Sequence, residues 1–193
     1  MDRKLAAILA ADVVGYSSLM ERDEKGTFAR LKRHRIEVFE PTIKRHHGRV
    51  FKRMGDGLLA EFGSVADAVE SAVAVQEEMA RRNNGLPQPE RIDLRIGVNL
   101  GDVIVEGKDL HGEGINIAAR LEQLADRGGV CVSGKVAKEV GNKLAFAFEP
   151  MGEHKVKNIA EPIAAYRVRF IGAPARNDIS PQAAHSRGKL QTV

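Results

Sequence analysis

The sequence predicts an α+β domain in which a mainly antiparallel sheet is covered by helices on one face. Short apolar segments with strand character alternate with amphipathic helical segments. Neighbouring strand segments are joined by short turns that contain Gly and Asp, which is typical of hairpins and favours antiparallel pairing. The 193 residues, 43% hydrophobic and 29% charged, are ordinary for one globular domain with a sizeable core.

The first predicted elements are a strand and a long helical segment. Residues 5–13 form an apolar run that predicts a strand, although its alanines would also suit a helix. Residues 23–47 are predicted to be helical. Pro41 should either divide this segment into two helices or begin the second one, and Gly48 suits its end. The inward side chains expected for this segment are Phe28, Leu31, Phe39 and Ile43.

A hairpin and an amphipathic helix follow. Residues 49–62 predict a hairpin around the turn Gly55-Asp56-Gly57. Residues 65–82 place apolar side chains three or four positions apart, which predicts a helix with one buried face. The polar stretch 83–90 contains two prolines and is expected to be a loop.

The second half continues the alternation of strands and helices. Residues 92–100 and 102–106 are expected to pair as a hairpin with its turn near Gly101-Asp102, where the aspartate serves turn chemistry. The remaining predicted elements are a helix at 115–125, a short buried strand at 129–133, a helix or turn at 136–142, and strands at 145–150 and 163–170.

The chain divides by pattern into a domain, residues 1–171, and a C-terminal tail, residues 172–193. The tail lacks any apolar period, so we expect it to be mobile. The longest apolar run has seven residues, against the roughly 20 that a transmembrane helix needs, so no membrane insertion is expected. The single cysteine, Cys131, has valine neighbours, which indicates a core residue in a reducing, cytoplasmic compartment.

Positive charge is concentrated between residues 22 and 53, which contain eleven Lys or Arg and four Asp or Glu. Such a surface attracts polyphosphates or nucleic acid, and it is equally typical of a solvated helix face. Aromatic residues make up only 5% of the chain, and no strand carries an aromatic-rich motif. Both facts argue against a stacking platform for RNA, so no nucleic-acid partner is expected.

Two distant segments each place an acidic residue in a polar turn beside apolar strand residues. Asp12 follows the first predicted strand, and Asp56 lies at the tip of the predicted hairpin. If the two turns converge, the carboxylates form a pair that can hold hard divalent cations. Asp-Gly between apolar runs is also a strong hairpin signal, so Asp56 alone would need no chemical role.

A third segment strengthens the interpretation of a nucleotide site. Gly112 and Gly114 open an apolar-periodic helix shortly after Asp109. Asn116 and Arg120 lie four residues apart and therefore share one face of that helix. Taken alone, both side chains would suit an ordinary helix surface.

Together these motifs resemble the catalytic domain of the class III nucleotidyl cyclases, the adenylate and guanylate cyclases, from about residue 4 to residue 170. The resemblance implies a ferredoxin-like core. The positions that it matches are Asp12 and Asp56 for metal ions, Lys52 in Lys-x-x-Gly-Asp and Asp109 in Asp-x-x-Gly-x-x-x-Asn for the base, and Asn116 and Arg120 for the ribose and α-phosphate. Backbone carbonyls near Val13 would complete the metal shell.

The resemblance implies conversion of ATP to 3′,5′-cyclic AMP and pyrophosphate, with two Mg²⁺ or Mn²⁺ ions per site. Lys52 supplies a donor and Asp109 an acceptor, which complements adenine, whereas guanine has the reverse pattern. Members of the family act as head-to-tail dimers with shared sites, so a homodimer is expected. Many members also carry a lysine for the terminal phosphates, and Lys157 or Lys155 is the candidate here.

Other functions stay open at this stage. A guanylate cyclase would use the same metal pair. A noncatalytic module that binds nucleotide or RNA would share the sheet, although a degenerate cyclase is expected to lack one of the six matched positions and none is missing. A diguanylate cyclase would need a Gly-Gly-Asp/Glu-Glu-Phe signature, which is absent from the sequence.

Overall fold

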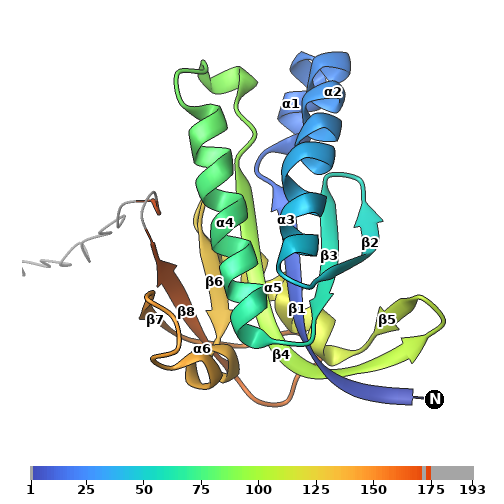
Figure 1. Ribbon diagram of the computed structural model, residues 1–193, viewed down its shortest axis with the longest axis vertical. Helices are drawn as coiled ribbons and strands as arrows, with labels where there is room; N and C mark the ends of the chain where they lie inside the picture. The colour runs from blue at the N-terminus through green and yellow to red at the C-terminus, as the bar shows by residue number, and fades with distance from the viewer. Residues whose placement is uncertain (1, 171–172, 175–193) are drawn as a thin grey trace, which may run out of the picture.

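One twisted sheet with β1 and β4 near its centre organises the fold (Figure 1). The computed structural model describes residues 2–170 and 173–174. The strands are β1 Asp2–Val13, β2 Arg49–Met54, β3 Gly57–Phe62, β4 Leu94–Glu106, β5 Asp109–His111, β6 Val130–Ser133, β7 Ala147–His154 and β8 Ile163–Arg169. The helices are α1 Tyr16–Arg22, α2 Glu24–His34, the π-helical turn η1 Arg35–Phe39, α3 Glu40–Arg45, α4 Val65–Asn83, the 3₁₀ turn η2 Gln88–Glu90, α5 Glu113–Leu124 and α6 Gly134–Val140.

The sheet confirms the predicted α+β class and its mainly antiparallel pairing. The strand order is β2-β3-β1-β4-β6-β8-β7, and β5 pairs with the end of β4. The β4–β6 pair is parallel, and the other pairs are antiparallel. The predicted tail, residues 172–193, lies outside the described residues except for Ala173 and Pro174, so the proposed domain boundary stays a prediction.

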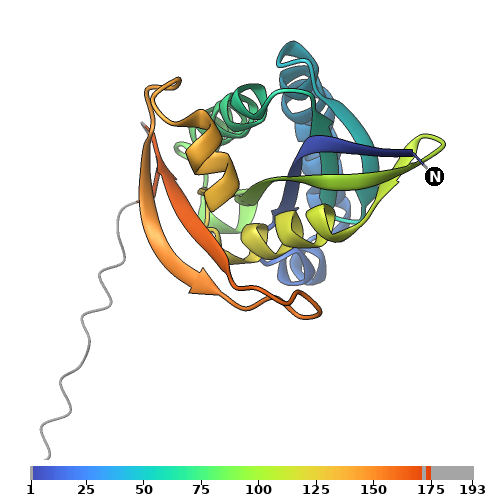
Figure 2. The same cartoon turned by 90° about the horizontal axis from the view of Figure 1, so that it is seen from below.

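Helices cover both faces of the sheet, so the prediction of one covered face was wrong. Ala7, Leu9, Ala11 and Val13 of β1 pack with α4 and α6, whereas Ala6 and Ile8 pack on the side of α5. Figure 2 shows α5 in yellow on one side of β1 and β4, with α4 in green on the other. The continuous apolar run of β1, rather than an alternating one, is the pattern of a strand buried on both faces.

Strand β4 is one continuous element, which corrects the predicted hairpin at Gly101-Asp102. Asp102 is paired with Leu5 of β1 in the middle of the ladder. Gly101 does not form a turn. It lets α5 approach the strand closely, because a Cβ there would lie 3.1 Å from Gly114 Cα in α5. The turn comes later, at Gly107, whose φ of +62° is accessible to glycine.

The helical segment 23–47 is confirmed as helical but differs in detail. Helix α1 precedes it and was not predicted. Pro41 lies in the first turn of α3, which confirms that a second helix begins there, and the chain is helical from η1 into α3 without a break. The widened π turn η1 comes just before the proline, whose nitrogen has no hydrogen to donate. Leu31, Phe39 and Ile43 are buried as predicted, whereas Phe28 is 57% exposed.

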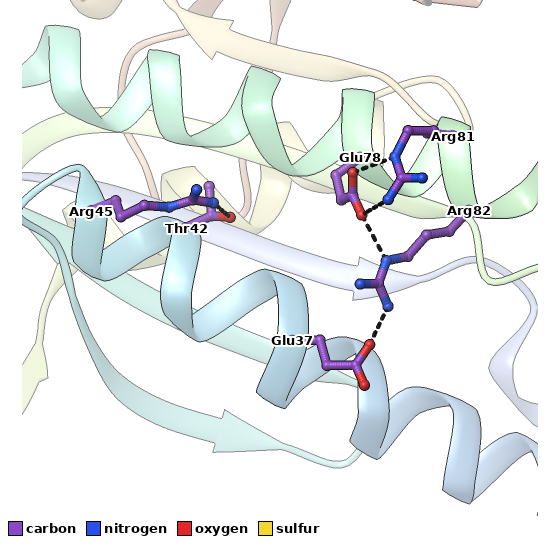
Figure 3. A network of polar contacts seen from close by, with 6 residues as sticks. All are labelled: Glu37, Thr42, Arg45, Glu78, Arg81 and Arg82. Atoms are coloured by element: carbon purple, nitrogen blue, oxygen red, sulfur yellow. Dashed lines mark hydrogen bonds and ion pairs between the residues drawn. The ribbon is translucent and has the colours of Figure 1, made fainter.

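Helix α4 is tied to η1 by a network of charged side chains (Figure 3). The Arg82 guanidinium donates to Glu37 at 2.6 Å and to Glu78 at 2.8 Å, and Arg81 donates to the same Glu78 carboxylate at 2.6 Å. Hydrogen bonds from Arg81 and Arg82 lower the pKa of Glu78 to about 2. The contact between η1 and α4 is therefore held at this end by four charged side chains.

Two further expectations can be compared with the structure. Cys131 is fully buried in β6, as expected for a core residue, and burial raises the pKa of its thiol to about 12. Among the described residues, the helices are too short or too polar for any of them to cross a lipid bilayer.

Candidate active site

Asp12 lies one residue before the end of β1, directly opposite Arg95 of β4. Arg95 donates to both carboxylate oxygens, from Nε to Oδ1 at 3.3 Å and from Nη2 to Oδ2 at 3.2 Å. These two hydrogen bonds hold the Asp12 carboxylate in place. The side chain is 25% exposed and therefore still open to a ligand. The neighbouring Val13 has a buried side chain, and the role predicted for its carbonyl stays a prediction.

Asp56 occupies the tight turn between β2 and β3, as the Gly-Asp-Gly sequence predicts. Gly55 adopts a φ of +46°, and its carbonyl accepts a hydrogen bond from the Arg35 guanidinium. Gly57 brings the turn against the end of β1, because a Cβ there would lie 2.9 Å from the Ala11 carbonyl oxygen. The turn that carries Asp56 therefore lies beside Asp12, as the convergence hypothesis required.

Glu122 of α5 is a third carboxyl group in this cluster, and the sequence analysis missed it. It is only 8% exposed. Burial raises its pKa to about 8, and a hydrogen bond to Asp12 and the charges of Asp12 and Asp56 act in the same direction. The signal was present in the sequence, because Glu122 interrupts the apolar stripe Ala118, Leu121 and Ala125, where an unpaired acidic residue is uncommon.

The close approach of α5 to β4 holds Glu122 under the two aspartates. A Cβ on Gly97 would lie 2.3 Å from both the Ala118 carbonyl oxygen and the Glu122 nitrogen. Only glycine at this position lets the helix backbone rest on the strand backbone. The acidic cluster of Asp12, Asp56 and Glu122 is thus built on rigid elements, with Asp56 in a tight turn.

Lys52 and Asp109 form a second group. Lys52 of β2 and Asp109 at the start of β5 have Nζ and Oδ2 4.0 Å apart, with 43% and 41% of their side chains exposed. The other oxygen of Asp109 accepts from the Leu110 backbone N–H at 2.9 Å, which orients the carboxylate. His111, to which no role was assigned, has its Nε2 3.9 Å from Asp109 and 3.2 Å from Glu106.

Asn116 and Arg120 form a third group with the lysines of the β7–β8 connection. They line a cavity of about 460 Å³ together with Ala119, Gln123, Lys155, Val156 and Lys157. Arg120 donates from Nη1 to Gln123 at 3.2 Å, and its buried Nε has no hydrogen-bond partner within the described part of the chain. Three cations and no carboxylate line the cavity among these residues, which suits an anion.

The structure therefore gathers the predicted site residues into three groups. The acidic cluster lies beneath α5, Lys52 and Asp109 lie together between β2 and β5, and the cationic cavity lies over the outer side of α5. Among the described residues, neither the acidic cluster nor the Lys52–Asp109 pair contributes to the lining of that cavity.

Comparison with known proteins gives consistent matches over the described fold. The sequence profile of the family described as "Adenylate and Guanylate cyclase catalytic domain" matches residues 3–169. A protein of Rhizobium meliloti (strain 1021) named "Putative adenylate cyclase 3" is 55% identical over 161 residues, which cover 83% of this chain and 27% of that protein. An adenylate cyclase of Streptomyces coelicolor is 32% identical over 144 residues, 72% of this chain and 35% of that protein.

A solved structure agrees with these matches. The crystal structure of an adenylate/guanylate cyclase/hydrolase from Silicibacter pomeroyi has a TM-score of 0.82 and 41% identity. The alignment covers 86% of this chain and 97% of that chain. The chain thus matches nearly the whole of a solved domain and 27% to 35% of the length of the two curated relatives.

Proposed function

Because the chain belongs to the adenylate and guanylate cyclase catalytic domain family, we propose that it converts ATP to 3′,5′-cyclic AMP and pyrophosphate. The observation that carries the choice of ATP is the pairing of Lys52 with Asp109. A lysine donor beside a carboxylate acceptor complements the N1 acceptor and N6 donor of adenine. Guanine presents O6 as acceptor and N1 as donor and would leave both protein groups mismatched.

Asp12 and Asp56 are the residues that would hold Mg²⁺ or Mn²⁺ ions. The donor set fits hard cations, because the cluster offers carboxyl oxygens and no nitrogen or sulfur ligand. When bound, a pair of such ions neutralises phosphate charge and favours ionisation of the attacking 3′-hydroxyl. Arg95 keeps the Asp12 carboxylate aimed while leaving a quarter of that side chain exposed.

The cationic cavity on α5 supplies the groups that act on the phosphates. The Arg120 guanidinium presents donors to an α-phosphate that gains charge as the 3′-oxygen attacks, so its contribution is largest in the transition state. Asn116 hydrogen-bonds the ribose and fixes the direction of attack. Lys157, with Lys155 beside it, binds the terminal phosphates that leave as pyrophosphate.

The site is shared between two copies of the chain in a head-to-tail homodimer. The separation of the acidic cluster from the cationic cavity by α5 supports this assembly. A closed twofold arrangement gives two composite sites, each with Asp12 and Asp56 from one copy and Lys52, Asp109, Asn116 and Arg120 from the other.

Mixing two inactive proteins tests the shared site. Asp12→Ala and Arg120→Ala each damage one half of a site, and a mixed dimer contains one intact site and one doubly damaged site. An equal mixture should recover about a quarter of wild-type cyclic AMP formation, because half of the dimers are mixed and each has one working site. Mixing Asp12→Ala with Asp56→Ala is the matched control and should recover nothing. Equal activity of both mixtures would contradict the shared site.

Substrate competition tests the choice of base. Purified protein with Mn²⁺ and equimolar ATP and GTP should form cyclic AMP in large excess over cyclic GMP. Lys52→Glu, which replaces the donor by an acceptor, should lower this preference by about tenfold or more, since a polar group left unpaired beneath the bound base costs about 1 to 3 kcal/mol. A wild-type protein that prefers GTP would refute the assignment. Binding of either nucleotide without turnover would indicate a noncatalytic module.

A further inference from the structure

A second group of metal-ligating side chains lies where α3 ends and α4 begins. His46, Asp67 and Glu70 each place one donor atom within 4.8 Å of the donors of the other two. His46 Nδ1 is 3.9 Å from Glu70 Oε2, and the neighbouring His47 Nδ1 is 3.4 Å from Asp67 Oδ2. These residues take no part in the proposed cyclase site, which is built on the end of β1, on β2 and the turn after it, on β5, on α5 and on the β7–β8 connection.

The backbone around this group is fixed by packing and capping. The His46 N–H donates to the Thr42 carbonyl at the end of α3, and the Asp67 N–H donates to the Ser64 side chain that caps α4. Gly48 lets the loop press onto the core, because a Cβ there would lie 2.4 Å from the Phe62 ring. The ligand-bearing ends of both helices are therefore held before any ion arrives.

The two helices face each other with opposite directions along one seam. Figure 1 shows that the end of α3 and the start of α4 lie toward the same end of the molecule. Farther along the seam, Glu37, Glu78, Arg81 and Arg82 join η1 to α4 (Figure 3). The histidine end of the seam has no comparable strong link between its described residues, since its ion pairs depend on protonated imidazoles at 3.4 and 3.9 Å.

The ligand chemistry selects a class of cation. Imidazole nitrogen together with carboxylate oxygen suits Zn²⁺ and related transition metals, whereas Mg²⁺ and Ca²⁺ favour oxygen alone. Zn²⁺ binds N and O donors at about 2.0 to 2.2 Å in a tetrahedron, which puts the donors about 3.3 Å apart. The observed donors lie within 4.8 Å of one another, which is wider than that spacing, and the three side chains are partly exposed, which leaves the group accessible.

We propose that His46, Asp67 and Glu70 bind a Zn²⁺-class divalent cation that ties the end of α3 to the start of α4. His47 lies beside Asp67 and orients that carboxylate, as outer partners of metal ligands commonly do. Because residues 46–48 lead directly into β2, the bound ion also fixes the start of the strand that carries Lys52.

Zinc titration of the wild-type protein in excess Mg²⁺ tests the site, because Mg²⁺ occupies oxygen-only ligands and leaves imidazole available. Calorimetry should give one Zn²⁺ per chain, and a hundredfold excess over the dissociation constant should raise the melting temperature by about 5 to 10 °C. Co²⁺ in place of Zn²⁺ should give the intense visible bands of a low-coordinate site. The Asp12→Asn/Asp56→Asn double variant should keep both signals.

Variants of a ligand from each helix, His46 after α3 and Glu70 in α4, make the test decisive. His46→Ala and the milder Glu70→Gln should each weaken Zn²⁺ binding by more than roughly tenfold, which is the loss expected for a residue that only supports a metal ligand. In EDTA, both variants should have the melting temperature of the wild-type protein. His154→Gln, on β7 at the opposite edge of the sheet from β2, is the matched histidine control and should bind like wild type. Wild-type protein that takes up no Zn²⁺, or His46→Ala and Glu70→Gln variants that bind Zn²⁺ as tightly as wild type, would overturn the proposal.

Discussion

The two sides of α5 differ in charge. Toward the sheet, the helix buries Glu122 next to Asp12, within the electrostatic reach of Asp56. Toward solvent, it presents Asn116 and Arg120 to a cavity that also holds Lys155 and Lys157. One twelve-residue helix therefore separates an acidic cluster suited to cations from a basic cavity suited to phosphates. A metal-bound triphosphate needs both carboxylates and cationic side chains around it, and in a single chain these two sets lie on opposite sides of α5. We therefore propose that a second copy of the chain completes the site.

The largest effect is expected on the acidic side. Asp56→Asn should lower cyclic AMP formation by about 10³-fold or more, because the several kcal/mol that bound metal contributes to the transition state are lost. Asp102→Asn, an exposed carboxylate in the middle of β4, is the matched control and should keep wild-type activity. Activity assays with Mg²⁺ and circular dichroism of both variants check the result. Asp56→Asn turning over at the wild-type rate would remove the metal assignment.

On the basic side, Arg120→Ala should lower kcat by about 10² to 10³ with a smaller change in KM, because the guanidinium acts mainly on the charge that develops during attack. Arg120→Lys keeps the charge without the planar donor fork and should fall between Ala and wild type. Steady-state kinetics separate the two parameters. A rise in KM with unchanged kcat would show that Arg120 only binds the substrate.

The buried side also predicts a pH dependence of stability in the metal-free protein. The pKa of Glu122 is raised to about 8 in the folded state, chiefly by burial, so its contribution to stability is present below the ordinary glutamate pKa. That contribution is lost as the pH rises toward 8, at up to about 1.4 kcal/mol per pH unit. Glu122→Gln cannot ionise, so in EDTA its unfolding free energy should fall less between pH 5 and pH 8. Urea unfolding curves measure this, and parallel pH profiles for both proteins would contradict it.

The smallest effect is expected for an exposed member of the basic cavity. Lys157→Ala should raise KM for ATP by about fivefold, because one exposed charge interaction is worth about 1 kcal/mol or less. Lys138→Ala, an exposed lysine on α6 outside the cavity, should leave KM unchanged. Equal KM values for Lys157→Ala and wild type would assign the terminal phosphates to other side chains.

Local signals predicted the parts of the fold that depend on neighbours in sequence. The Gly55-Asp56-Gly57 turn, helix α4 and the buried strand β6 all carry their patterns within a few residues. Gly101-Asp102 has the composition of a turn, yet its glycine serves the approach of Gly114 from α5. That contact joins positions thirteen residues apart and cannot be read from either segment alone.

The candidate site shows the same division between local and tertiary information. Asp12, Asp56, Lys52, Asp109, Asn116 and Arg120 were singled out by motif, and their assigned roles stay predictions. Glu122 was overlooked although it interrupts an apolar stripe, because only the packing of α5 shows that this position is buried. Its unusual environment exists only because β4 contains Gly97, 25 positions earlier in the chain.

The contact at Gly97 also limits how the protein can be regulated. Because the Ala118 carbonyl and the Glu122 nitrogen lie against Gly97, the backbone of α5 has no room to slide or roll at this point. In the homodimer that we propose, a change of activity would then come from displacing one protomer against the other, with the acidic and basic halves moving as fixed bodies. Any regulator of such a pair would need only to change the angle between the two protomers.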